Sequence, residues 1–186
     1  HDYRWEILRD LQLGSKRGEE VAASLGLELK TWEVGPTNMT LAIYPHDERY
    51  QAIAQRIGPI QLLAACRVMG VHLHLGVGDL DEAIAVHNRF VSHIDDLCSM
   101  GDHSQGERLQ LYAMMQLRPK PSVYASKEDF YRVACEEGFD ENPRNCWHLV
   151  RISRHGTVEL RMFGMTPNNI KITGWVSHCL GIAQLA

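Results

Sequence analysis

One short run of the chain, residues 70–78, alternates between apolar and polar side chains and is bounded by glycines. Successive side chains of a β-strand point to opposite faces, so His72 and His74 would share one face, roughly 7 Å apart. The residues on the other face are all apolar: Val71, Leu73 and Leu75. The pattern predicts a strand with one face in a core and two imidazoles on the other.

A second run, Thr157–Gly164, repeats this arrangement. Its apolar positions are Val158, Leu160 and Met162, and the positions between them carry Glu159 and Arg161. If the two strands share a sheet, we expect His72, His74, Glu159 and Arg161 to converge on the same face.

Helical spacing of apolar residues dominates the rest of the chain. We expect helices at residues 3–13, 19–25, 49–66 (broken or kinked at 58–59), 79–100, 107–117, 126–137 and 170–185. Residues 14–18 read as a linker, residues 27–34 and 146–153 as strands, residues 41–44 as a short apolar piece and residues 118–121 as a break. Residues 154–156 would close a β-hairpin, with Gly156 free to take a positive φ. The last helix is expected to pack against the sheet.

Length and composition favour a single domain over residues 1–186. The chain has 186 residues, of which 45% are hydrophobic and 23% charged, enough for one compact core. We therefore expect an α+β fold, in which helices cover one face of an antiparallel sheet and the other face is open as a ligand cleft.

Charge and cysteine usage exclude several classes of protein. The formal net charge is −4 and no long Lys/Arg run occurs, which argues against a nucleic-acid partner. No apolar stretch has the length of a membrane span and no signal segment is visible, so we expect no membrane partner and a soluble, cytoplasmic chain. The five cysteines are scattered without Cys-x-x-Cys spacing, which suggests neither a disulfide framework nor a zinc knuckle.

Imidazole and carboxylate groups on one face are the ingredients of a metal site. His72, His74 and Glu159 suit zinc, iron, manganese or magnesium to different degrees, and the alternative for the histidines is local hydrogen bonding. Arg161 and Arg151 offer planar forks for a carboxylate or phosphate, unless they are only solvated charges at a strand edge. His87, beside the apolar stripe of its helix, fits a hydrogen-bonded core histidine better than a ligand.

Several segments together resemble the carboxylate–amine ligases of glutamate–cysteine ligase family 2, in the glutamine synthetase-like superfamily. They are Tyr-Pro-His-Asp-Glu-Arg-Tyr at 44–50, the histidine strand, residues 81–90, Val-Arg-Ile-Ser at 150–153 and Gly-Thr-Val-Glu-Leu-Arg at 156–161. Their order and spacing, and the apolar helix after the last strand, are also similar to the carboxyl-terminal half of glutamine synthetase.

The resemblance implies a glutamine synthetase-like catalytic domain and a role for each polar residue. His72 and Glu159 would bind metal, His74 and Arg151 would lie near nucleotide phosphates, and Arg161 would bind the amino-acid substrate, which makes Arg151 and Arg161 the implied catalytic residues. The implied cofactors are ATP and Mg or Mn. The implied reaction joins a glutamate-like carboxylate to an amine, cysteine by family analogy, through an acyl phosphate.

The chain departs from that family at its beginning. The family's opening strand carries Glu-x-Glu metal ligands, and no early glutamate of this chain stands in such a pattern: Glu6, Glu19, Glu20, Glu28 and Glu33. We expect a partial domain without its amino-terminal strands, inactive by itself, and a homo-oligomer because exposed strand edges need cover. The alternatives are a catalytically silent binding or regulatory domain and, from another class, a zinc-dependent hydrolase built on the two histidines and Glu159.

Overall fold

The computed structural model describes residues 3–39, 41, 43, 45–115 and 120–184. The chain divides into two compact units, one of Glu33–Gly164 and one of His1–Trp32 with Met165–Ala186. A single domain over residues 1–186 stays a prediction. None of the helices in the described residues has both the length and the apolar character needed to cross a membrane.

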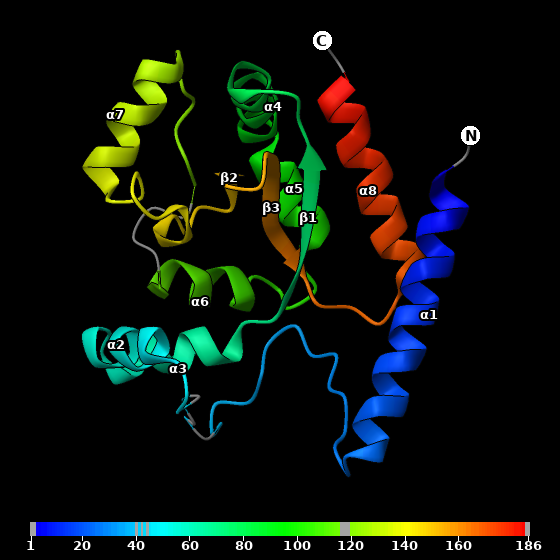
Figure 1. The fold of residues 1–186 in the computed structure, drawn as a ribbon. Coiled ribbons are helices and arrows are strands. Elements are labelled where there is room, and N and C mark those ends of the chain that lie inside the picture. Colours follow the sequence, from blue (N-terminus) through cyan, green and yellow to red (C-terminus); the bar gives the residue numbers. More distant parts are fainter. Residues whose placement is uncertain (1–2, 40, 42, 44, 116–119, 185–186) are drawn as a thin grey trace. The chain divides into compact units, whose positions relative to one another are not determined.

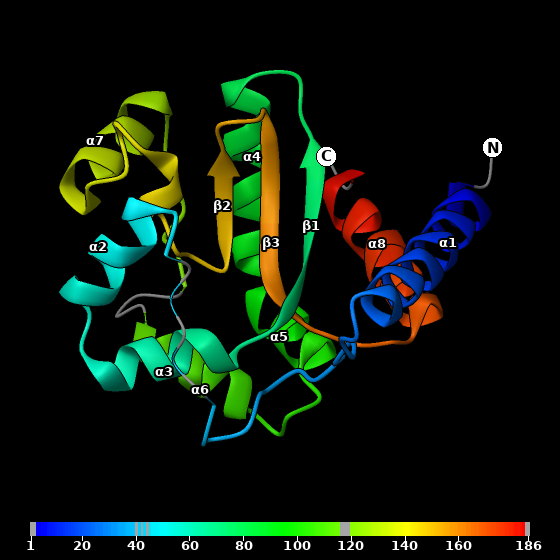
Figure 2. The same ribbon diagram turned by 60° about the horizontal axis from the view of Figure 1, so that its bottom comes forward.

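The unit Glu33–Gly164 is built around a three-stranded antiparallel sheet. Its strands are β1 (Gly70–Gly76), β2 (Val150–Ser153) and β3 (Thr157–Gly164), in the order β1-β3-β2, and Figure 2 shows β3 in the middle. Both alternating runs are therefore strands of one sheet, as predicted, and the architecture is α+β. The predicted strand 146–153 is shorter than expected and begins only at Val150.

The hairpin between β2 and β3 forms where the sequence predicts it. Gly156 takes a φ of 69°, a left-handed conformation that glycine adopts without steric cost. The apolar face of β3 is the core of the unit, because Val158, Leu160 and Met162 are all fully buried. Helices α4 (Leu80–Ser92) and α5 (Ile94–Gly101) contact the sheet and cover this face (Figure 2).

The pairing of β1 with β3 contains a β-bulge. Leu73 pairs with Leu160 and Val71 pairs with Phe163, so the two residues between, Arg161 and Met162, oppose the single residue His72. A bulge bends its strand and re-aims the side chains it carries. Arg161 therefore leaves the sheet from an irregular position.

The described residues of this unit also form four further helices and one 3₁₀ turn (Figure 1): α2 (Glu48–Arg56), α3 (Pro59–Arg67), α6 (Glu107–Met115), α7 (Lys127–Glu137) and the turn Pro143–Asn145. The predicted break at residues 58–59 is confirmed, because Pro59 begins a new helix. The predicted start and end of α7 are also confirmed. The Ser126 side chain caps its first turn, and Gly138 ends it with a φ of 73°.

The prediction of one continuous helix over residues 79–100 is wrong. The helix begins after its cap Asp79 but ends at Ser92, and His93 (φ −107°, ψ 11°) separates it from α5. Asp95 and Asp96 lie in the first turn of α5, where negative charge stabilises a helix N-terminus. Two acidic residues in mid-sequence thus mark a second helix start.

The other unit contains α1 (Tyr3–Ser24) and α8 (Asn169–Gln184), which contact each other. The predicted linker at residues 14–18 is wrong, because α1 runs through both glycines and Lys16 pairs with Glu20 one turn later. The predicted strand 27–34 is also wrong. Only Val34 makes a bridge, an isolated one with Val68, and a strand needs a paired neighbour along its length.

Some expectations concern features that the described residues do not include. Within the apolar piece 41–44, residues 42 and 44 lie outside them. So do residues 116–117 at the end of the helix 107–117, residues 118–119 of the break 118–121 and residue 185 of the last helix. The packing of that helix against the sheet stays a prediction.

Candidate functional site

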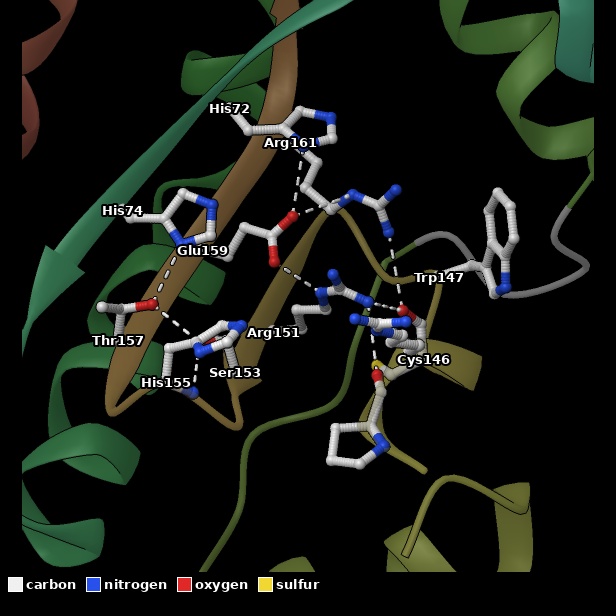
Figure 3. Close-up of polar contacts among 12 residues, drawn as sticks. His72, His74, Cys146, Trp147, Arg151, Ser153, His155, Thr157, Glu159 and Arg161 are labelled. Atoms are coloured by element: carbon white, nitrogen blue, oxygen red, sulfur yellow. Dashed lines mark hydrogen bonds and ion pairs between the residues drawn. The ribbon is translucent and has the colours of Figure 1, made fainter. Parts of the chain in front are cut away.

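The second face of the sheet carries a carboxylate surrounded by nitrogen donors (Figure 3). The Glu159 Oε2 atom accepts a hydrogen bond from Arg151 Nε at 2.7 Å. Its Oε1 atom lies 3.2 Å from His72 Nδ1 and 3.4 Å from Arg161 Nε. The strand register explains the meeting, because Arg151 is directly opposite Glu159 on β2 and His72 is near it on β1.

Glu159 is almost completely buried, with 2% of its surface exposed. Burial alone would raise the pKa of this carboxyl. The hydrogen bonds from His72 and Arg151, together with the charges of Arg151 and Arg161, outweigh burial and hold the pKa at about 2. Glu159 is therefore ionised throughout the neutral range.

His74 lies on the same face but has a different partner. It is directly opposite Glu159 in the strand register, yet its Nδ1 atom is 3.0 Å from the Thr157 hydroxyl (Figure 3). The Thr157 hydroxyl is also 2.7 Å from the hydroxyl of Ser153. The structure thus brings together His72, Glu159, Arg161 and Arg151. His74 lies beside them, next to the hydroxyl groups of Thr157 and Ser153.

Arg151 is fixed by more than the carboxylate. Its Nη1 atom donates to the carbonyl oxygens of Cys146 at 2.6 Å and Pro143 at 3.2 Å. These carbonyls belong to the segment that leads into β2, so Arg151 joins this segment to the sheet. Its side chain is 17% exposed, which argues against a freely solvated strand-edge charge.

Arg161 lies among aromatic side chains. Its guanidinium carbon is over the rings of Tyr112 and Trp147, at 5.8 Å and 5.5 Å from their centroids. Only 12% of the Arg161 side chain is exposed, and its Nε atom is buried without an aligned hydrogen-bond acceptor. This arginine too is held in place, and part of its donor capacity is unused.

A pocket of about 170 Å³ opens beside Glu159 at the hairpin end of the sheet. Its charged or titratable lining residues are His74, Arg144, Arg151, Arg154, His155 and Glu159. Three arginines against one carboxylate give this pocket a positive character. It is suited to an oxyanion such as a carboxylate or a phosphate.

Sequence reasoning missed several of the residues around Glu159. Thr157 and Ser153 could have been found, because they alternate in phase with Glu159 and Arg151 along their strands. Tyr112 and Trp147 carry no local signal of a role. They reach Arg161 only through the packing of α6 and of the segment before β2.

Glu159 and His72 are the residues expected to bind metal, and the structure places them in contact. Both oxygens of Glu159 already have protein partners, so a cation would replace at least one of them. In the part of the chain that is described, no group of three or more His, Cys, Asp and Glu side chains is arranged to hold a metal ion.

Comparison with known proteins finds relatives that share about half of this chain. The chain is 31% identical over 106 residues to a glutamate–cysteine ligase of Halobacterium salinarum, and 34% identical over 83 residues to a putative glutamate–cysteine ligase 2 of Salinispora tropica. A protein of the latter name from Micrococcus luteus is 27% identical over 108 residues. The matched segments are 50%, 45% and 50% of this chain.

These matches cover only part of the relatives. They span 29%, 21% and 27% of the lengths of those three proteins, so the chain spans less than a third of each. No protein-family model matches the chain. No solved structure matches it either. The similarity suggests a relationship to glutamate–cysteine ligases over half of the chain.

Proposed function

We propose that this protein is an ATP-dependent carboxylate–amine ligase. It would activate the side-chain carboxylate of a glutamate-like substrate as an acyl phosphate. The acyl group would then be transferred to an amine with release of phosphate, and cysteine is the first amine to test. Two lines support the proposal: the similarity to glutamate–cysteine ligases, and the chemistry of the face around Glu159.

The observation that carries the proposal is the charge balance at Glu159. Arg151 and Arg161 bring two positive charges to one buried carboxylate, and all three side chains are at most 17% exposed. A partly buried positive charge without a counterion is costly, and a bound anion would remove that cost. A ligase needs such an anion-binding site, because the phosphoryl donor and the carboxylate that accepts the phosphoryl group are both anions.

The donor set fits the anionic parts of the cofactor. Arg151 would hold phosphate oxygens, with His74 near them, and Arg161 would hold the amino-acid substrate. His72 and Glu159 would contribute to binding Mg or Mn, the cation that offsets the charge of the phosphates in such reactions. Because these two residues are a small ligand set, we expect the 186 residues alone to bind nucleotide poorly and to turn over negligibly.

A second function has an observation in its favour. Both oxygens of Glu159 are paired with His72, Arg151 and Arg161, so the carboxylate is neutralised by the protein itself. Such a site would suit a binding or regulatory domain that takes up an anion without consuming ATP. The two functions differ in turnover and share ligand binding.

Phosphate release from ATP separates the two functions. We expect release by the longest product that the gene encodes, with Mg or Mn, only when L-glutamate and an amine are both present. Upstream of His1 we expect the gene to encode a strand with Glu-x-Glu. If the protein binds its ligands without consuming ATP, the binding domain is the function that remains. The same holds if no segment is encoded upstream and this chain shows no turnover.

Matched arginine variants test whether the turnover comes from this site. Arg161→Gln should reduce phosphate release strongly, since it removes one of the two arginine charges beside Glu159. Arg132→Gln is the control, because Arg132 makes comparable ion pairs with Asp129 and Glu136 on α7 but lies outside the site. Equal loss in both variants would assign the activity to another source.

A further inference from the structure

Helix α6 touches the site through two side chains that are one helical turn apart, Arg108 and Tyr112. Residues four apart lie on the same face of a helix, so both point toward the sheet. Both are buried, with 2% and 3% of their surface exposed. Arg108 contacts the backbone of Arg161, and Tyr112 contacts the side chain of Arg161.

Arg108 holds the β-bulge. Its Nη2 and Nη1 atoms donate to the carbonyl oxygens of Arg161 at 3.0 Å and Met162 at 2.9 Å, the two residues that oppose His72. Its Nε atom donates to the carbonyl of Met69 at 2.9 Å, directly before β1. One guanidinium therefore fixes the backbone on both sides of the irregular pairing, from which Arg161 leaves the sheet.

Tyr112 holds the side chain of the same residue. Its ring lies under the Arg161 guanidinium, and its hydroxyl donates to the Trp147 carbonyl oxygen at 2.7 Å. That hydrogen bond fixes the residue whose own ring is the second aromatic neighbour of Arg161. Aromatic faces attract a guanidinium and do not occupy its N–H donors.

The Arg161 donors are consequently only partly used. The Nε atom is 3.4 Å from Glu159 Oε1 without hydrogen-bond alignment, and Nη1 reaches the Cys146 carbonyl only at 3.5 Å. Nη2 makes no hydrogen bond within the described residues. The contacts that hold this arginine fix its position while leaving N–H groups for a planar anion, the geometry in which an arginine binds a carboxylate.

We propose that Arg108 and Tyr112 are positioning residues which, with the Trp147 ring, hold the Arg161 guanidinium ready to bind the carboxylate of an amino-acid ligand. The identity of the ligand rests on the proposed function. The positioning itself rests on the contacts described above. In either a ligase or a binding domain, loss of the aromatic contacts would weaken the ligand's carboxylate contact and leave phosphate binding at Arg151 in place.

The test is binding of L-glutamate and, separately, of ATP with Mg, measured by calorimetry on the longest product that the gene encodes, with and without the aromatic rings. We expect Trp147→Leu and Tyr112→Leu to weaken L-glutamate binding about tenfold, the scale of one or two lost cation–π contacts. Trp147→Phe should recover most of the affinity because it restores a ring. The affinity for ATP should change by less than about twofold in each variant.

A spectroscopic signal reports the position of Arg161 without any ligand. Ring currents from two nearby aromatic rings should displace the Nε–Hε resonance of Arg161, which Arg161→Gln identifies by its loss. We expect the resonance to move in Tyr112→Leu and Trp147→Leu and to broaden or move in Arg108→Lys. Tyr50→Leu is the matched control, because it removes an exposed tyrosine stacked on another arginine, Arg49.

The outcomes separate this inference from the proposed function. The inference fails if the aromatic variants bind L-glutamate as tightly as the parent chain, or if the parent binds it no better than Arg161→Gln does. Should L-glutamate binding depend on the rings while ATP is never consumed, the positioning role stands and the ligase function fails. If Tyr112→Leu does not fold, Trp147→Leu decides, because Trp147 is only half-buried.

Discussion

Two buried glutamates in the unit Glu33–Gly164 have opposite electrostatic behaviour. Glu159 is 2% exposed and Glu33 is 9% exposed, so burial alone would raise the pKa of both. The pKa of Glu159 is nevertheless lowered to about 2, while that of Glu33 is raised above its ordinary value of 4.5. The difference lies in what surrounds each carboxylate.

Glu33 has few partners that favour its charged form. Burial is the largest influence on its pKa, and the hydrogen bond from the His103 backbone N–H, 2.8 Å from Oε2, only partly opposes it. The charge of Asp102 raises the pKa further. Arg108 is near enough to lower it, but its N–H donors are bound to backbone carbonyls.

The comparison shows what distinguishes a candidate ligand site from a buried structural carboxyl. Glu33 packs against Gly164, where any side chain would collide with its carboxyl group, and it links the start of the unit to the end of β3. Glu159 has a comparable degree of burial but three nitrogen partners and a pocket beside it. Cationic partners in excess, rather than burial, mark the site.

The largest effect is expected for Glu159→Ala. Removal of this carboxylate leaves the charges of Arg151 and Arg161 partly buried and uncompensated, which should lower the free energy of unfolding by about 3 to 5 kcal/mol. Urea unfolding at neutral pH measures it. Glu159→Gln keeps the shape of the side chain and separates the loss of charge from the loss of packing.

Glu33→Ala is the matched control for that variant. It removes a carboxyl that burial disfavours in its charged form, so its cost should be limited to a small cavity and one unpaired N–H, about 1 to 3 kcal/mol. A larger loss for Glu33→Ala than for Glu159→Ala would refute the claim that cationic partners distinguish the two positions.

The sheet and its polar face could be predicted from local sequence, whereas the surroundings of Glu159 could not. Period-two alternation is a property of consecutive residues, so β1, β3 and the shared face of His72, Glu159 and Arg161 followed from it. The hydroxyl of Tyr112 meets Trp147 across 35 positions of sequence. The sequence around Tyr112 and the sequence around Trp147 give no indication of this contact.

The failures of prediction have the same origin. Residues 27–34 alternate like a strand, but pairing with a neighbouring strand decides whether a strand forms, and of these residues only Val34 is assigned to a bridge, an isolated one with Val68. Gly14 and Gly18 suggested a linker, yet a glycine costs a helix only about 1 kcal/mol and a long helix absorbs it. Glu33 belongs to no motif, and its burial is not visible in the sequence.

Arg108→Met should have the next largest effect. The substitution leaves three carbonyl oxygens without their donor, which should cost about 2 to 3 kcal/mol in unfolding free energy. It also removes a charge that lowers the pKa of Glu33, so that pKa should rise further. Urea unfolding and a carboxyl NMR titration measure the two effects. An unchanged Glu33 pKa would show that Arg108 does not act on this carboxylate.

The pH dependence of Glu33→Gln should have the opposite sign to that of Glu159→Gln. The raised pKa of Glu33 means that its ionisation destabilises the folded state at neutral pH, and this penalty disappears as the pH falls through the folded pKa to 4.5. Glu33→Gln should therefore be more stable than the parent at neutral pH, by at most about 1 kcal/mol, the scale of one net hydrogen bond.

For Glu159 the lowered pKa contributes stability that is fully present above pH 4.5 and is lost as the pH falls toward about 2. Glu159→Gln should consequently be less stable than the parent at neutral pH, and the difference should shrink only below pH 4.5. Urea unfolding across the acid range gives both curves. Curves of the same sign would mean that the two carboxylates have similar surroundings.

The smallest effect is expected for His72→Phe. The His72 hydrogen bond is the first of the contacts that lower the pKa of Glu159, so its loss should raise that pKa from about 2 toward 4.5. The side chain of His72 is 40% exposed, and the free energy of unfolding at neutral pH should change by less than about 1 kcal/mol. A carboxyl NMR titration of Glu159 measures the shift. His74→Phe is the control, since the His74 ring bonds to Thr157 although it faces Glu159 in the strand register. An equal shift in both variants would mean that Glu159 responds to the general polarity of the β1 face and not to the specific contact with His72.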